Sequence, residues 1–141
     1  MKKLLLLTIL NLLTTILFAQ KEGDNTIIVT VKDTANLYER VRRAITFTDL
    51  TIRSDSNPDT LVTHSERIYN KSIFIVAITK INGNKVEISG AFGLGQEDFW
   101  GYPAWPRSYK RAVYFKGSEA WHVLRRIAIK LDGEMQFLKA D

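Results

Sequence analysis

The sequence predicts an α+β fold: an antiparallel sheet of about four to five strands with two helices packed on one face. Two segments place apolar residues at helical spacing, and several runs between them have the alternation or the β-branched content of strands. Consecutive strands joined by turns favour antiparallel pairing, and two helices that are apolar on one side need a sheet face to cover.

The first 19 residues have the pattern of a secretory signal peptide. Lys2 and Lys3 supply the positive start, an apolar run extends from Leu4 to Phe18, and Ala19 is the small residue before the expected cleavage site. Polar residues interrupt this run, and it is shorter than a membrane span requires. We therefore expect residues 1–19 to be removed and residues 20–141 to form a single α+β domain. The mature protein would be secreted or periplasmic, with no stable membrane span.

Composition excludes several functional classes. The chain of 141 residues contains no cysteine, which excludes disulfide scaffolds, thiol catalysis and cysteine-based zinc sites. The first 19 residues hold two of the 20 lysines and arginines and none of the 15 acidic residues, so residues 20–141 carry a formal charge of +3. A charge this small does not indicate nucleic-acid binding, and we expect no nucleic-acid partner.

The first half of the domain predicts one helix among short strands. Residues 26–32 alternate as a strand, and residues 37–45 have the spacing of an amphipathic helix, with Asp33 or Thr34 as its N-cap. Shorter strands are predicted on either side of a turn that is rich in Asp, Ser, Asn and Pro. The turn is residues 54–59, and the two short strands are residues 50–53 and 60–63.

A β-hairpin is the clearest local prediction. Residues 72–81 are rich in β-branched and aromatic residues, and Asn82-Gly83-Asn84 connects them to an alternating run that ends near Phe92. Asn-Gly is a preferred two-residue turn between paired strands. The nearly continuous apolar stretch at 73–78 also predicts a central strand whose second face is partly covered, with a second copy of the chain as one candidate cover.

The end of the chain predicts a short strand and a second helix. Residues 112–116 have strand character, and Ser118 is placed to cap a helix whose apolar residues follow a regular stripe up to Leu131. Asp132-Gly133 would end this helix, with the glycine in the left-handed conformation. Residues 134–141 have no clear pattern.

The order β-α-β-β-β-β-α, with Asn36-Leu37-Tyr38-Glu39-Arg40 opening the first helix, resembles small secreted bacterial domains of unknown function that have a TATA-binding-protein-like fold. The resemblance covers most of residues 20–141 in architecture. It implies a shape, and it supplies no activity and no catalytic residue. Shared architecture does not imply DNA binding, because function depends on the site.

Residues 93–109 differ in kind from the rest of the sequence. They contain five aromatic residues, three glycines, two prolines and the acidic pair Glu97-Asp98. Such a loop suits a protein interface, where Trp, Tyr and Arg dominate the binding energy, or a sugar ligand stacked on aromatic rings. Alternatively, the rings fold back and cover an open end of the sheet. On the binding interpretation, the contact residues are Trp100, Tyr102, Trp105, Arg107 and Tyr109.

These patterns favour a non-catalytic binding or assembly module of the cell envelope, whose partner is an envelope protein or a cell-wall glycan. The alternative is a glycan-acting enzyme that uses Glu97 or Asp98. Glycoside hydrolysis needs two carboxyl groups that face each other, whereas sequence neighbours usually point apart. His64 and His122 have no spacing typical of a catalytic triad or a metal site. We therefore expect no catalytic residue, no cofactor and no metal.

Two basic clusters lie on the predicted helices. We interpret both as solvated helix faces, with contact to anionic lipid as the alternative. They consist of Arg40, Arg42 and Arg43 on the first helix, and Arg125, Arg126 and Lys130 on the second.

Overall fold

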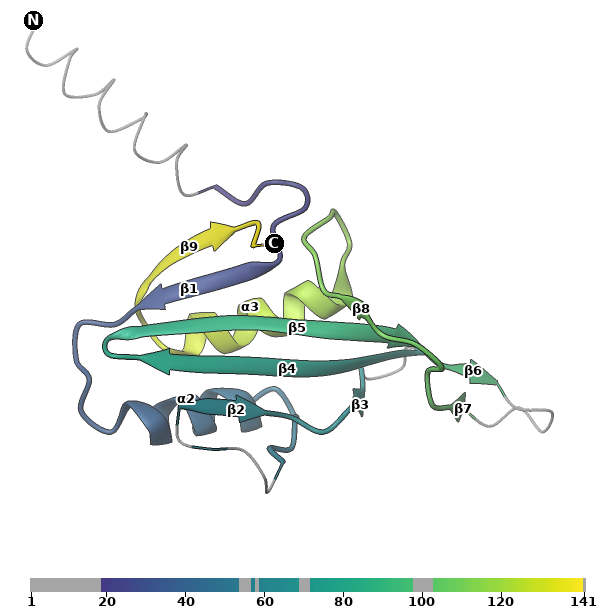
Figure 1. Cartoon of the computed structure of the whole chain (residues 1–141), viewed down its shortest axis with the longest axis horizontal. Coiled ribbons are helices and arrows are strands. Elements are labelled where there is room, and N and C mark those ends of the chain that lie inside the picture. Colours follow the sequence, from purple (N-terminus) through teal and green to yellow (C-terminus); the bar gives the residue numbers. More distant parts are fainter. Residues whose placement is uncertain (1–18, 54–56, 58, 69–71, 98–102, 141) are drawn as a thin grey trace, which may run out of the picture.

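The computed structural model in Figure 1 describes residues 19–53, 57, 59–68, 72–97 and 103–140. Apart from Ala19, the expected signal segment lies outside the described residues. The elements in chain order are β1 (Thr26–Thr30), α2 (Leu37–Thr46), β2 (Thr60–Val62), β3 (Glu66–Arg67), β4 (Ile73–Asn82), β5 (Lys85–Leu94), β6 (Gln96–Glu97), β7 (Pro103–Ala104), β8 (Lys110–Arg111), α3 (Glu119–Lys130) and β9 (Glu134–Leu138).

In the described part of the chain, the main sheet is antiparallel and contains seven strands. Its order is β2-β4-β5-β1-β9, with the short strands β3 and β8 paired to β4 and β5. Both helices lie behind this sheet in Figure 1, and α3 packs against β1, β4, β5 and α2. The expected α+β class is confirmed, but the expected number of four to five strands is too low. The additional strands β3 and β8 have only two residues each, too few for a sequence pattern to identify.

Two predicted strands are wrong. Residues 50–53 contribute only an isolated bridge between Ile52 and Thr63. Residues 112–116 form no strand; instead Lys110 and Arg111 pair with β5, and the Ala112 amide continues this pairing with a bond to the Gly90 carbonyl at 2.8 Å. Each of these segments is held by residues outside it, so local alternation does not locate its pairing.

The β4–β5 hairpin is confirmed, but its turn is displaced by one residue from the predicted Asn-Gly pair. Asn82 and Lys85 are the last paired residues, so Gly83 and Asn84 are the two central turn residues. Gly83 has φ of 59°, whereas Asn84 is not among the residues with positive φ. A positive φ at the first central position alone is the type II′ pattern, in which glycine is preferred.

The helix boundaries confirm one predicted cap and correct another. The Ser118 hydroxyl caps α3 by accepting a hydrogen bond from the Trp121 amide at 3.3 Å, as predicted. The N-cap of α2 is Asn36 rather than Asp33 or Thr34, and its side chain makes no capping bond. Asp33 instead accepts from the Ala35 amide at 2.8 Å, which closes the turn before the helix. Within the described part of the chain, no helix is long and apolar enough to cross a membrane.

The glycine after α3 has a different role from the one predicted. Asp132, with φ of 53°, is the left-handed residue, and Gly133 has no positive φ. A Cβ atom on Gly133 would lie 2.6 Å from the Thr30 carbonyl oxygen and 2.7 Å from Val29 Cγ1. Gly133 therefore lets the chain pass close to β1 before β9 pairs with it.

The hydrophobic core lies between the helices and the inner sheet face. Trp121 is fully buried at its centre, with ring centroids of Tyr114 and Phe137 at 6.0 and 6.3 Å. Among the described residues, all members of the core and of its partly buried rim lie between Ile27 and Phe137, within residues 20–141. On the opposite sheet face, Val76 and Ile78 are half-buried.

Arg40 connects the two helices and is not simply a solvated cation. Its guanidinium donates to the Leu131 carbonyl at 2.9 Å and to the Asp33 carbonyl at 2.7 Å. The Leu131 carbonyl is at the C-terminus of α3, where a cation satisfies an unpaired acceptor and interacts favourably with the helix dipole. Arg40 therefore differs from its exposed neighbour Arg43.

Replacing Arg40 by methionine should lower the free energy of unfolding by about 1–2 kcal/mol, because both bonds to carbonyl oxygens are lost. Urea denaturation measures this change when the dependence of the unfolding free energy on urea concentration is the same for the variant and the wild type. Arg43→Met is the matched control, because Arg43 is exposed one turn away, and its effect should stay within about 0.5 kcal/mol. Equal losses in the two variants would contradict the bridging role of Arg40.

Candidate functional site

Among the described residues, the two most exposed large apolar side chains, Trp105 and Leu94, lie at the end of the β4–β5 hairpin opposite its turn. The surface around them includes the last residue of β5, the segment that returns from β7, and β8, all at the right of Figure 1. We call it the distal surface and define it by Leu94, Trp105, Arg107, Tyr109 and Lys110.

The cross-strand pair of Phe74 and Gly93 supports Trp105, and we call this pair the seat. Phe74 on β4 is paired with Gly93 on β5, and the ring centroids of Trp105 and Phe74 are 5.1 Å apart with a 41° tilt. Phe74 is buried at 6% exposure, whereas Trp105 is 65% exposed. The indole ring is therefore supported from below and presented to solvent on its outer side.

Pro106 occupies the other half of the seat. A Cβ atom on Gly93 would lie 2.4 Å from Pro106 Cβ and 2.8 Å from the Ser108 carbonyl oxygen. Only glycine leaves room for the returning chain at this position. Trp105 therefore packs on Phe74, and the next residue, Pro106, packs on Gly93, the cross-strand partner of Phe74.

The segment after the seat is anchored at a second point. The Tyr109 hydroxyl is hydrogen-bonded to Ser65 Oγ at 2.6 Å, and Ser65 lies between β2 and β3. Lys110 then pairs with Phe92 in the main sheet. The distal surface is consequently held between β5 and the β2–β3 connection.

An open recess lies between the end of β5 and the segment that follows Trp105. Arg107 and Lys110 are exposed cations at its wall, and Leu94, at 63% exposure, is its most exposed apolar residue. No carboxylate is among the described residues that line it. The lining residues are Phe92, Gly93, Leu94, Arg107, Ser108 and Lys110.

Three of the five predicted contact residues lie together on this surface: Trp105, Arg107 and Tyr109. Trp100, Tyr102 and the acidic Asp98 lie outside the described residues, and Glu97 pairs with Pro103 between β6 and β7. Sequence reasoning missed Leu94, Lys110 and the seat at Phe74. Gly93 was the available signal, since a glycine inside a strand pattern marks a close backbone approach.

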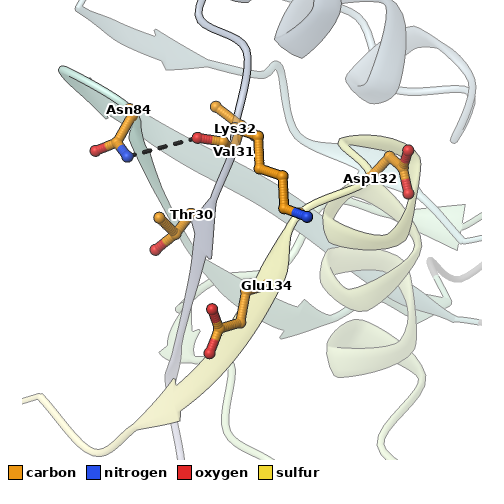
Figure 2. Close-up of a pocket in the computed structure, with 7 residues that line it drawn as sticks. Thr30, Val31, Lys32, Asn84, Asp132 and Glu134 are labelled. Atoms are coloured by element: carbon orange, nitrogen blue, oxygen red, sulfur yellow. Dashed lines mark hydrogen bonds between the residues drawn. The ribbon is translucent and has the colours of Figure 1, made fainter.

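Other candidate sites are weaker. Figure 2 shows a polar recess between the end of β1, the start of β9 and the hairpin turn, where the Lys32 side chain extends toward Asp132 and Asn84 donates to the Val31 carbonyl at 3.5 Å. Its charged side chains, Lys32, Asp132 and Glu134, are all exposed. His64 and His122 are exposed as well, and no group of three or more His, Asp or Glu residues in the described ranges could hold a metal ion.

A protein with Trp105 as its only tryptophan should report directly on the seat. Trp100→Phe combined with Trp121→Phe leaves this single ring, and its 65% exposure predicts red-shifted emission that acrylamide quenches readily. The reference is the protein with Trp121 alone, whose fully buried ring should emit at shorter wavelength and resist quenching. Blue-shifted, protected emission from Trp105 would mean that the ring is part of the core.

Replacing Gly93 by alanine should displace Pro106 and Trp105 from the seat. The added methyl group overlaps Pro106 and the Ser108 carbonyl, so we expect a loss of about 1–3 kcal/mol in the free energy of unfolding. In the protein with Trp105 alone, the emission should change in the same variant. Ser89→Ala, four residues earlier on β5, is the control; wild-type stability and emission in Gly93→Ala would refute the seat.

Comparison with known proteins supplies no family for this chain. A scan against protein-family models gives no match, and a search of curated proteins returns no significant relative. The function proposed below therefore rests on the geometry of the distal surface.

Proposed function

We propose that this protein is an exported, non-catalytic binding or assembly module of the cell envelope, and that its distal surface holds an envelope protein. The observation that supports this proposal most strongly is the exposure of Trp105 on a fixed support. The ring is 65% exposed although Phe74 lies directly beneath it.

A supported aromatic ring is well suited to binding. Tryptophan, tyrosine and arginine are enriched among the few residues that dominate protein interfaces. A side chain already held in one orientation loses less conformational entropy when a partner covers it. Trp105 is held by Phe74, and Tyr109 is oriented by its hydrogen bond to Ser65.

The surroundings of Trp105 indicate what kind of partner fits. Trp105 is the apolar centre of this surface, and Arg107 and Lys110 are exposed cations on the segment that follows it. Interfaces typically combine an apolar core with a polar rim of complementary charge. A partner with an apolar pocket bordered by acidic side chains therefore fits best.

A glycan-acting enzyme is less well supported. Such an enzyme needs two carboxyl groups facing each other across the scissile bond. The described residues that line the recess at the end of β5 include none. The cationic rim instead favours a ligand that brings its own negative charge.

Replacing Trp105 by alanine should weaken partner binding strongly while the domain stays folded. Residues 20–141 immobilised on a support should retain one or more envelope proteins, and the variant should bind them about 30-fold more weakly, the loss expected for a central interface residue. Phe115→Ala is the matched control, because Phe115 is 43% exposed but lies just before α3. Its binding should equal that of the wild type.

Three results would contradict this proposal. Unfolding of Trp105→Ala would show that the ring is structural, and unchanged retention by this variant would place the interface elsewhere. Release of sugars from cell-wall polymers by the wild-type protein would favour the glycan-acting enzyme. Circular dichroism and thermal unfolding of both variants distinguish the first of these results from the second.

A further inference from the structure

The helix layer has a strongly basic outer face. The exposed residues of α3 follow one stripe, His122, Arg125, Arg126, Ile129 and Lys130, and the half-buried Glu119 at the start of the helix is its one acidic residue. On α2 the corresponding stripe is Glu39, Arg42, Arg43 and Thr46, where Glu39 forms a salt bridge with Arg42 at 3.3 Å. Both helices bury their opposite sides against the same sheet, so the two stripes face the same way.

This charge is concentrated and not a property of the whole molecule. Together α2 and α3 contain six arginines and lysines and two glutamates, a formal charge of +4. Residues 20–141 carry only +3 in total, so the remainder of the domain sums to −1. The molecule therefore has a charged side and would be oriented by an anionic surface.

Two large apolar side chains project from the same basic face. Phe47, directly after α2, is 61% exposed, and Ile129 on α3 is 51% exposed. Lys130 Nζ lies 3.6 Å from the centroid of the Phe47 ring, which links the two helices at the surface. Beside this contact, Arg40, Arg43, Ala44, Phe47 and Lys130 line a shallow recess between the helices.

We propose that this basic helix face, defined by Arg42, Arg43, Phe47, Arg125, Arg126, Ile129 and Lys130, docks on an anionic phospholipid bilayer. Clustered cations are attracted to anionic headgroups, and the exposed side chains of Phe47 and Ile129 enter the boundary between headgroups and acyl chains. A soluble polyanion in water offers the charge but no apolar phase for Phe47 and Ile129. The combination therefore favours a membrane surface.

This surface is separate from the distal surface. It lies on the helix layer, whereas the distal surface is at the end of the hairpin and contains none of the same residues. A protein docked through its helices would leave the outer face of the sheet directed away from the membrane. The docking proposal does not depend on the partner proposed for Trp105.

Vesicle co-sedimentation tests the docking. Residues 20–141 contain every described residue of the hydrophobic core and omit the apolar segment that could itself insert into lipid. They should bind vesicles of one part phosphatidylglycerol to two parts phosphatidylcholine, with affinity falling as NaCl increases, and should bind pure phosphatidylcholine only weakly. Equal binding to both kinds of vesicle would overturn the proposal.

Matched pairs of charge variants locate the binding face. Arg43→Gln with Arg126→Gln should weaken binding about 25-fold, from about fivefold per cation removed. Arg125→Gln with Lys130→Gln is an independent second pair with the same expectation. Lys80→Gln with Lys85→Gln removes two exposed cations of the β4–β5 hairpin and should change binding less than twofold. Equal weakening by this control pair would mean that net charge alone governs binding, which would overturn the proposal.

Changes at Phe47 and Ile129 distinguish binding to a bilayer from binding to a soluble polyanion. Phe47→Ser with Ile129→Gln keeps every cation of the face, and it should weaken vesicle binding several-fold while leaving binding to polyphosphate unchanged. Vesicle binding that is unaffected by this double change, or polyphosphate bound more tightly than the vesicles, would show a polyanion site and contradict membrane docking. Circular dichroism confirms that each variant is folded before it is compared.

Discussion

The pairing of β4 with β5 is the constraint on which the rest of the structure depends. Ten residue pairs join the strands, from Ile73 opposite Leu94 to Asn82 opposite Lys85. Because strand side chains alternate between faces, this register directs Ile75 and Ala77 to the core and Phe74 and Val76 to the other face. A shift by one residue would exchange the two sets.

Glycines at two positions make this register specific. A Cβ atom on Gly90 would lie 2.6 Å from the Val76 carbonyl oxygen and 3.1 Å from Leu124 Cδ2, so α3 packs closely on the sheet only with glycine there. Gly93, three residues later, leaves the matching space for Pro106 on the opposite face. Strand β5 thus packs against α3 on one face and against Pro106, next to Trp105, on the other.

Local patterns were sufficient for the parts of the fold that are stabilised locally. The two helices, the hairpin and the Ser118 cap follow from spacing, turn residues and a capping hydroxyl. Strands β3 and β8 have only two residues each, and β8 and β9 pair with strands that do not adjoin them in the chain, so no short pattern identifies them. Arg40 was misread as solvated for the same reason, because its acceptor at Leu131 is 91 residues away. For the candidate site, the sequence indicated Trp105, Arg107 and Tyr109, but not the support under Trp105.

A two-dimensional NOE spectrum of residues 20–141 tests this account most directly. In the register described here, Phe74 is opposite Gly93, and both lie beneath the returning chain. The account predicts NOEs between the Phe74 and Trp105 rings and between the Gly93 α-protons and Pro106. NOEs from Phe74 to residues of α3, with none to Trp105, would indicate a register shifted by one residue. That result would contradict both the seat and the distal surface built on it.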